Sequence, residues 1–273
     1  MGKKSEIALA SITWIATILT FSVLTLIIAF ILVKGIPYLK PSMFAFNYTS
    51  ENVSLMPAMI TTIIMTIMAL IIAVPLGIFA SIYLVEYAKR GSKAVALVRM
   101  TTETLSGIPS IVYGLFGLLF FVTFLGWGFS MLAGAFTLGI MILPLIIRSS
   151  EEALKSVPDS FREGSFGLGA GKLRTVFRIV LPSAIPGILA GVILAIGRIV
   201  GETAALIYTS GTVAQIPTGP MQSARTLSVH MYSLSSEGLH TNEAYATAVV
   251  LLVIVVLINT ASAKIAKQIG RIK

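Results

Sequence analysis

Residues 104–147 read TLSGIPSIVYGLFGLLFFVTFLGWGFSMLAGAFTLGIMILPLII, a stretch of 44 residues without a charged side chain. A helix that crosses a bilayer once needs about 20 apolar residues. The stretch is therefore long enough for two crossings, and we expect the turn between them near Gly126-Trp127-Gly128. So long an uncharged run predicts that lipid surrounds much of the chain, which indicates a membrane protein with several spans.

The composition supports this interpretation. Of the 273 residues, 56% are hydrophobic and only 11% are charged, whereas a soluble domain has about 25% charged residues. The chain has no cysteine, which excludes disulfides, thiolate metal sites and cysteine nucleophiles. The two histidines, His230 and His240, lie in one polar segment without cysteines or paired carboxylates nearby. We therefore predict no metal site and no cofactor in this chain.

Four further apolar runs bring the predicted total to six spans. The first, residues 7–33, is too long for the apolar core of a signal peptide, so we interpret it as an uncleaved span. The others are predicted at about 57–85, from Pro182 past Arg198 to about Tyr208, and at 244–263. We divide the chain into a first span with its outer loop (1–56), a core (57–263) and a tail (264–273).

The positive charges predict the orientation. With both ends in the cytoplasm, sixteen of the 20 lysines and arginines lie inside, three outside and Arg198 within a span. Cytoplasmic loops of membrane proteins carry such an excess. The net charge of +9 is therefore no sign of nucleic-acid binding, because the charges separate apolar runs rather than forming one stripe. We expect a multi-pass protein of the cytoplasmic membrane with both termini inside.

Residues 149–182 form the predicted cytoplasmic loop between spans four and five. Ser160 and Glu163 have the spacing of a capping box, in which a hydroxyl and a carboxylate cap the start of a helix reciprocally. We expect a short helix at about 160–168, ended by glycines, and a second helical stretch at 172–180. An ordinary amphipathic linker is the alternative interpretation of the capping box alone.

The spaced residues of this loop resemble the cytoplasmic signature of ABC-importer permeases. That signature reads Glu-Ala-Ala, three residues, Gly, nine residues, Ile, one residue, Leu-Pro. Gly164 and Ser165 replace the two alanines. The resemblance implies an all-α, type I ABC importer permease bundle whose short coupling helix docks on an ATPase subunit. The residues that it assigns to coupling are Glu163, Gly164, Gly169, Leu181 and Pro182, to which we add Ser160 from the capping box.

A phosphate-binding loop for ATP is absent. The run that ends in Gly171-Lys172 has Phe166 where the first glycine of such a loop belongs, and Leu173 where a serine or threonine belongs. We therefore expect this chain not to be an enzyme. ATP and Mg²⁺ are expected in a partner ATPase subunit.

Arg198 and Glu202 are charged residues inside the predicted fifth span. In a continuous helix they share one face, being four residues apart. Charges at such depth face a bundle interior or a wet path. One interpretation is a buried salt bridge that fixes helix packing. The other is an anion site, in which arginine offers a planar fork to phosphate oxygens and glutamate accepts the proton of hydrogen phosphate.

The run from Gly197 to Ala204, GRIVGETA, resembles a signature of phosphate-importer permeases. Further matches, such as ETLSGIPSIVYG at 103–114, make the chain most similar to the A-type permease of the phosphate ABC importer. That family implies a second permease in a heterodimer, two ATPase subunits and a periplasmic phosphate-binding protein. The predicted substrate path consists of Arg198, Glu202 and Thr203, with Ser106 and Ser110 beside Gly107-Ile108-Pro109, although that Gly-Pro segment equally fits a simple bend.

Three alternatives remain at this point. The same class of permease can carry another oxyanion, such as molybdate or sulfate. A self-sufficient secondary transporter is a second alternative, but such folds often show internal repeats and we find no obvious duplication. A purely structural membrane scaffold is the third.

Overall fold

The computed structural model describes residues 3–89 and 91–271, and that part of the chain is helical without a β-strand. Short π-helical segments continue α2 (Tyr83–Tyr87) and α4 (Leu118–Phe124) and join α7 to α8 (Val176–Val180). The helices are α1 (Lys3–Gly35), α2 (Met56–Ile82), α3 (Lys93–Ser106), α4 (Ser110–Gly117), α5 (Met131–Lys155), α6 (Asp159–Gly167), α7 (Lys172–Thr175), α8 (Leu181–Val200), α9 (Ala204–Ile207), α10 (Leu227–Glu237) and α11 (Thr241–Arg271).

Among the described residues, five helices are long and apolar enough to cross a membrane. These helices are α1, α2, α5, the continuous helix from α7 to α8, and α11. A sixth crossing results if α3 and α4 with its continuation form one bent span. The predicted all-helical fold is thus confirmed, and the six predicted spans are reached when the bent pair counts as one.

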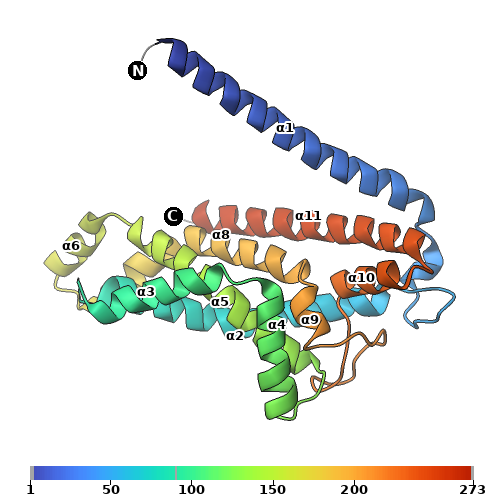
Figure 1. Ribbon diagram of the computed structural model, residues 1–273. Helices are drawn as coiled ribbons and strands as arrows, with labels where there is room; N and C mark the ends of the chain where they lie inside the picture. The colour runs from blue at the N-terminus through green and yellow to red at the C-terminus, as the bar shows by residue number, and fades with distance from the viewer. Residues whose placement is uncertain (1–2, 90, 272–273) are drawn as a thin grey trace.

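The third span differs from the prediction. We expected it to begin near Thr104 and to run to the turn at Gly126, but α3 and α4 meet at an angle of 100° (Figure 1). The break falls at Gly107–Pro109. Proline has no N–H for the helical ladder and disfavours helical angles in the residue before it, which explains the break. The predicted turn is confirmed, since Gly126 and Gly128 have φ angles of +68° and +62°.

The core lies where α2, α5 and α8 pack together (Figure 1). Small residues permit the close approach, as expected between helices in lipid. A Cβ atom on Gly77 of α2 would lie 2.6 Å from Ile146 Cγ2 of α5, and one on Gly191 of α8 would overlap Ser149. Buried apolar side chains fill the remaining space, among them Met65, Leu138, Ile142, Ile146 and Ile199.

Two elements stand away from this core. Helix α1 leaves the bundle at an angle, and no residue in its most apolar stretch is buried (Figure 1). The C-terminal end of α1 touches α11, where the Phe30 ring lies edge-on to the Tyr245 ring with 5.8 Å between the ring centroids. At the other end of the bundle, α6 projects beyond the long helices (Figure 1). Both elements leave surface open for other molecules.

Candidate functional site

The fifth span ends earlier than predicted. Helix α8 stops at Val200, Gly201 caps it, and a new helical turn, α9, begins at Ala204. Glu202 starts that turn, because its Oε1 accepts the Ala205 N–H at 3.0 Å. The expectation that Arg198 and Glu202 share one face of a continuous helix is therefore wrong. A glycine followed by a carboxylate that can cap the next turn is the physical reason.

Arg198 is half-buried near the end of α8. Among the described residues, none forms a hydrogen bond or an ion pair with its guanidinium, so the predicted salt bridge to Glu202 is not formed in this conformation. Its charge interacts with the side chain of Tyr113 on α4. The Tyr113 hydroxyl in turn donates a hydrogen bond of 2.7 Å to the Leu105 carbonyl across the α3–α4 break. Arg198 is thus an unpaired cation beside that break.

Close packing brings the two interrupted helices together. A Cβ atom on Gly114 of α4 would lie 2.8 Å from the Cα of Ala205, and one on Gly117 would lie 2.5 Å from Thr209 Cγ2. The segment after Glu202 therefore lies directly against α4. In membrane transporters, interrupted helices of this kind free backbone polar groups and line ion sites.

The predicted hydroxyl residues differ in their surroundings. Ser110 is half-buried at the start of α4, one turn before Tyr113, and Thr203 is half-buried between α8 and α9. Ser106 is exposed, and its hydroxyl donates to the Glu103 carbonyl at 2.7 Å. Ser110 therefore lies on the same helix as Tyr113, the residue with which Arg198 interacts, whereas the Ser106 hydroxyl is engaged within its own helix.

Two hydroxyl residues near Glu202 were not assigned from the sequence. The Ser228 hydroxyl, at the start of α10, donates to the Glu202 carbonyl at 2.5 Å. The next residue toward the N-terminus, Leu227, donates its N–H to Thr62 Oγ1 on α2 at 2.8 Å, across 165 positions of sequence. Sequence spacing carries no signal for contacts of this kind. They fix the backbone of Glu202 to α10 and α10 to α2.

A second unpaired arginine lies in the segment between α9 and α10. Arg225 is 6% exposed, two of its guanidinium nitrogens have no hydrogen-bond partner, and it stacks over the Tyr48 ring at 4.7 Å. The same ring lies edge-on to the buried His230. Burial, followed by the charge of Arg225, lowers the pKa of His230 to about 3, against a small opposing effect of Val53. His230 is therefore neutral at physiological pH.

Helix α6 begins differently from the prediction. It starts at Asp159 with Pro158 in the capping position, and no side chain caps it. The capping box of Ser160 and Glu163 is therefore not formed, and that prediction is wrong. Proline at 158 sets the extended backbone that precedes the helix. The helix extent, Asp159–Gly167, agrees with the expected 160–168.

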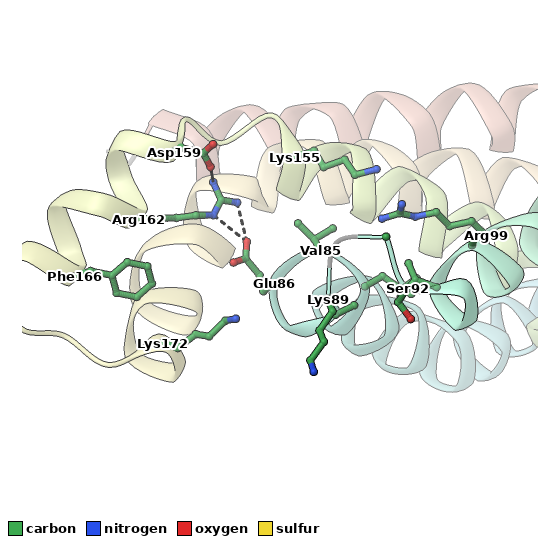
Figure 2. A pocket seen from close by; sticks show the side chains of 15 residues that line it. Val85, Glu86, Lys89, Ser92, Arg99, Lys155, Asp159, Arg162, Phe166 and Lys172 are labelled. Atoms are coloured by element: carbon green, nitrogen blue, oxygen red, sulfur yellow. Dashed lines mark hydrogen bonds and ion pairs between the residues drawn. The ribbon is translucent and has the colours of Figure 1, made fainter.

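Arg162 holds the start of α6 instead. Its Nη2 lies 2.7 Å from Glu86 Oε1, at the end of the π-helical continuation of α2, and the two side chains are only 14% and 8% exposed. Figure 2 shows this ion pair together with the weaker contact to Asp159 at 3.2 Å. The carbonyls of Leu154 and Val157, at the end of α5, accept the remaining hydrogen bonds at 3.0 and 2.8 Å.

The end of α6 confirms the predicted role of Gly169 in stopping the helix. Gly169 has φ +80°, its N–H bonds to the Phe166 carbonyl at 2.9 Å, and the Ala170 N–H bonds to the Ser165 carbonyl at 3.1 Å. This pair of bonds is the Schellman arrangement that follows a left-handed glycine. Ser165 is buried, and its hydroxyl contacts that of Thr175 on α7 at 2.8 Å. Gly164 faces open space.

A sequence model of one protein family matches residues 73–271, which include every site residue described above except Tyr48, Val53 and Thr62. The family is described as the binding-protein-dependent transport system inner membrane component. The chain belongs to this family. It is therefore a multi-pass permease of an ABC importer in the inner membrane.

Individual relatives agree with the assignment. The permease is 37% identical over 209 residues to the probable ABC transporter permease protein YqgI of Bacillus subtilis, which covers 71% of each chain. It is 36% identical over 212 residues to the phosphate transport system permease protein PstA 1 of Mycobacterium tuberculosis, covering 76% of this chain and 69% of that one.

Solved structures share the fold of this permease. A bacterial alginate ABC transporter aligns over 98% of this chain and 96% of that one, with a TM-score of 0.72 at 15% identity. The MetNI methionine ABC transporter aligns over 78% of this chain and 93% of that one, with a TM-score of 0.60 at 20% identity. At such identities the likeness concerns the fold alone.

The permease has a cavity of about 680 Å³ beside α6. Arg162 and Glu86 form one wall, and the first turns of α3 form another (Figure 2). Most of its charges are already engaged: Arg99 and Lys155 both contact Glu151, at 2.7 and 2.6 Å. Among the described residues, no cluster of three or more potential ligands could hold a metal ion.

Proposed function

We propose that this permease moves inorganic phosphate into the cytoplasm, driven by ATP hydrolysis in a partner. The observation that carries the proposal is Arg198, an unpaired guanidinium beside a break in α3–α4 and a break after α8. Arginine presents a planar fork of N–H groups that suits phosphate oxygens. The name of the mycobacterial relative, a phosphate transport permease, points to the same substrate.

Glu202 gives the site a means of choosing phosphate. One of its oxygens accepts the Ala205 N–H, and no described residue donates to the other. A free carboxylate oxygen can accept the proton of hydrogen phosphate, and sulfate has none at neutral pH. A site built to hold that proton disfavours an anion that lacks it. Thr203 and Ser110 add hydroxyls to the path. Ser106 stays a predicted contributor that requires rotation of its side chain.

In this proposal, the movement driven by ATP hydrolysis reaches the permease at α6. This helix exposes Phe161, Glu163, Phe166 and Leu168, the last 91% exposed, and so presents an apolar and acidic surface beyond the bundle. We infer that an ATPase subunit covers it, and that Gly164 leaves room for close contact. Gly169 and Leu181-Pro182 connect α6 to the continuous helix α7–α8. Both termini lie in the cytoplasm in this proposal.

The complete transporter in this proposal contains four kinds of protein. A second, homologous permease pairs with this chain in a heterodimer, two ATPase subunits bind ATP and Mg²⁺, and a periplasmic phosphate-binding protein delivers the ion. Lipid surrounds the spans. The chain itself holds no cofactor and no nucleic acid.

Reconstitution tests the proposal. The chain is purified in mild detergent with its co-purifying partners, placed in vesicles, and supplied with labelled phosphate, the binding protein and ATP. We expect ATP-dependent uptake that unlabelled phosphate inhibits and that equal sulfate or molybdate does not. Stronger inhibition by sulfate or molybdate would assign a different oxyanion. Phosphate flux through the chain alone, without an ATPase, would instead indicate a secondary transporter.

A further inference from the structure

Arg162 connects three helices through a saturated set of hydrogen bonds. An arginine side chain has five N–H groups. Nε and Nη2 donate to Glu86 Oε1 at 3.1 and 2.7 Å, and Nη1 donates to Asp159 Oδ1 at 3.2 Å. The other two bonds reach carbonyls at the end of α5. The start of α6 is therefore tied to α5 and, through Glu86, to α2.

The other end of α6 is tied to its surroundings less directly. Beyond Gly167 the chain passes through Gly169 and Gly171, and a Cβ atom on any of these three glycines would meet nothing within 4 Å. Glycine adds conformational freedom to a connection. The buried contact of Ser165 with Thr175 holds α6 against α7. A displacement of α6 is therefore transmitted most rigidly at Arg162, where five hydrogen bonds of 2.7–3.2 Å, four of them part-buried, hold the start of the helix.

Helix α2 connects this joint to the substrate path. With its π-helical continuation it extends from Met56 to Tyr87, so Glu86 lies at one end and Thr62 near the other. Thr62 accepts the Leu227 N–H at 2.8 Å, and the adjacent Ser228 donates to the Glu202 carbonyl at 2.5 Å. Each step in this series is a buried hydrogen bond or a continuous helix.

We propose that the Arg162–Glu86 pair is a positioning joint that passes the movement of α6 through α2 to the backbone of Glu202. This inference rests on the proposed function. Buried ion pairs add little net stability compared with apolar packing, so a pair held this tightly at a moving element serves position. The covalent route from α6 to α8 reaches Glu202 from one side, and α2 with α10 holds it from the other.

The test measures phosphate transported per ATP hydrolysed in the reconstituted complex. Glu86→Gln weakens the link to α2 and leaves the Arg162 bonds to Asp159, Leu154 and Val157 in place. We expect phosphate per ATP to fall about two- to thirty-fold while assembly and ATP hydrolysis persist. The matched control is Arg148→Gln, which removes an exposed ion pair to Glu152 at 3.2 Å. An unchanged ratio in Glu86→Gln would overturn the proposal.

A second variant, at the other end of α2, distinguishes loss of transmission from misfolding around Arg162 and Glu86. Thr62→Val keeps the shape of the side chain and removes the acceptor for Leu227, without touching α6. We expect a lowered ratio here too, and the double variant with Glu86→Gln to be no worse than the more severe single variant. Effects that multiply would show two independent routes and contradict the joint. If the wild-type complex transports no phosphate, the proposed function is refuted. If the wild-type complex transports phosphate and both variants keep its ratio of phosphate to ATP, the role of the Arg162–Glu86 pair is refuted and the proposed function stands.

Discussion

Arg162 and Arg198 are two arginines with partly buried side chains and opposite surroundings. All five N–H groups of Arg162 are engaged, by two carboxylates and two carbonyls. Arg198 has no hydrogen-bond or ion-pair partner among the described residues. Desolvating a charge without a partner is costly, so an unpaired arginine indicates a place where a mobile anion completes the site. A saturated arginine instead indicates a fixed connection between elements.

The largest effect that tests this difference is expected at Arg198. Arg198→Ala removes the fork of N–H donors, and each charged hydrogen bond contributes about 1.5–3 kcal/mol. Two lost bonds correspond to a fall in phosphate uptake of about 100-fold or more, with normal assembly of the complex. Labelled phosphate uptake measures it, and Arg148→Ala is the control. Wild-type uptake in Arg198→Ala would refute its place in the path.

Arg225 sharpens the comparison because it is also unpaired, yet it lies in the segment between α9 and α10, beside His230. The pKa of His230 is lowered from 6.5 to about 3 in the folded state. Below pH 6.5 the unfolded chain binds a proton that the folded chain does not, so stability is lost as pH falls from 6.5 toward 3. At pH 5 the loss is about 2 kcal/mol.

Thermal unfolding of the purified permease at pH 7.5 and pH 5.0 measures this effect. His230→Phe should reduce the difference between the two unfolding midpoints. The matched control His240→Gln also removes one imidazole, outside the buried cluster. An identical pH difference in wild type and His230→Phe would contradict the assignment of the titration to this residue.

Glu202→Gln tests how the unpaired site selects its anion. The amide can donate to sulfate, which the carboxylate repels. Sulfate should therefore inhibit phosphate uptake at a concentration about tenfold lower than in wild type. Glu103→Gln, an exposed carboxylate near the α3–α4 break, serves as the control. If sulfate remains as poor a competitor in Glu202→Gln, the carboxylate has no part in selection.

The smallest effects are expected at two glycines, one within α6 and one in the turn that follows it. Gly169 has φ +80°, and an alanine there costs about 1–2 kcal/mol. Gly164 lies within α6 and faces open space, so an alanine adds helix stability of about 1 kcal/mol. Thermal unfolding of the two single variants should shift in opposite directions. Shifts in the same direction would show that α6 is held by contacts other than its own helix.

Much of the architecture follows from the sequence because lipid imposes long apolar runs. The starts of α1, α2, α5 and α11 and the turn at Gly126 follow from such runs. The ends of α5 and α11 do not, because these helices continue to Lys155 and Arg271, past the predicted ends at 147 and 263. The angle between α3 and α4 does not, since proline predicts a break but not its direction. The end of α8 at Val200 was missed because apolarity continues past it, although Gly201 was a local signal.

The site residues likewise divide into those that the local sequence predicts and those that only the packing shows. Arg198 and Glu202 stand out because charges are rare in an apolar run, and the spacing from Glu163 to Leu181-Pro182 marks the predicted coupling loop. The prediction of a capping box was wrong because residue spacing is a weak signal where a tertiary contact holds the start of the helix. Arg162 finds Glu86, 76 positions away, and Ser228 finds Glu202, 26 positions away. Such pairs follow from packing, which periodicity does not encode.

The central claim is that phosphate passes the unpaired Arg198 between the two breaks. The chain has no cysteine, so Ser110→Cys places a single thiol one helical turn from Tyr113, the residue that interacts with Arg198. In the assembled transporter, a charged thiol reagent should modify this cysteine, phosphate should slow the modification several-fold, and Arg198→Ala should remove that protection. Modification at one rate with and without phosphate, or no modification at all, would contradict the account.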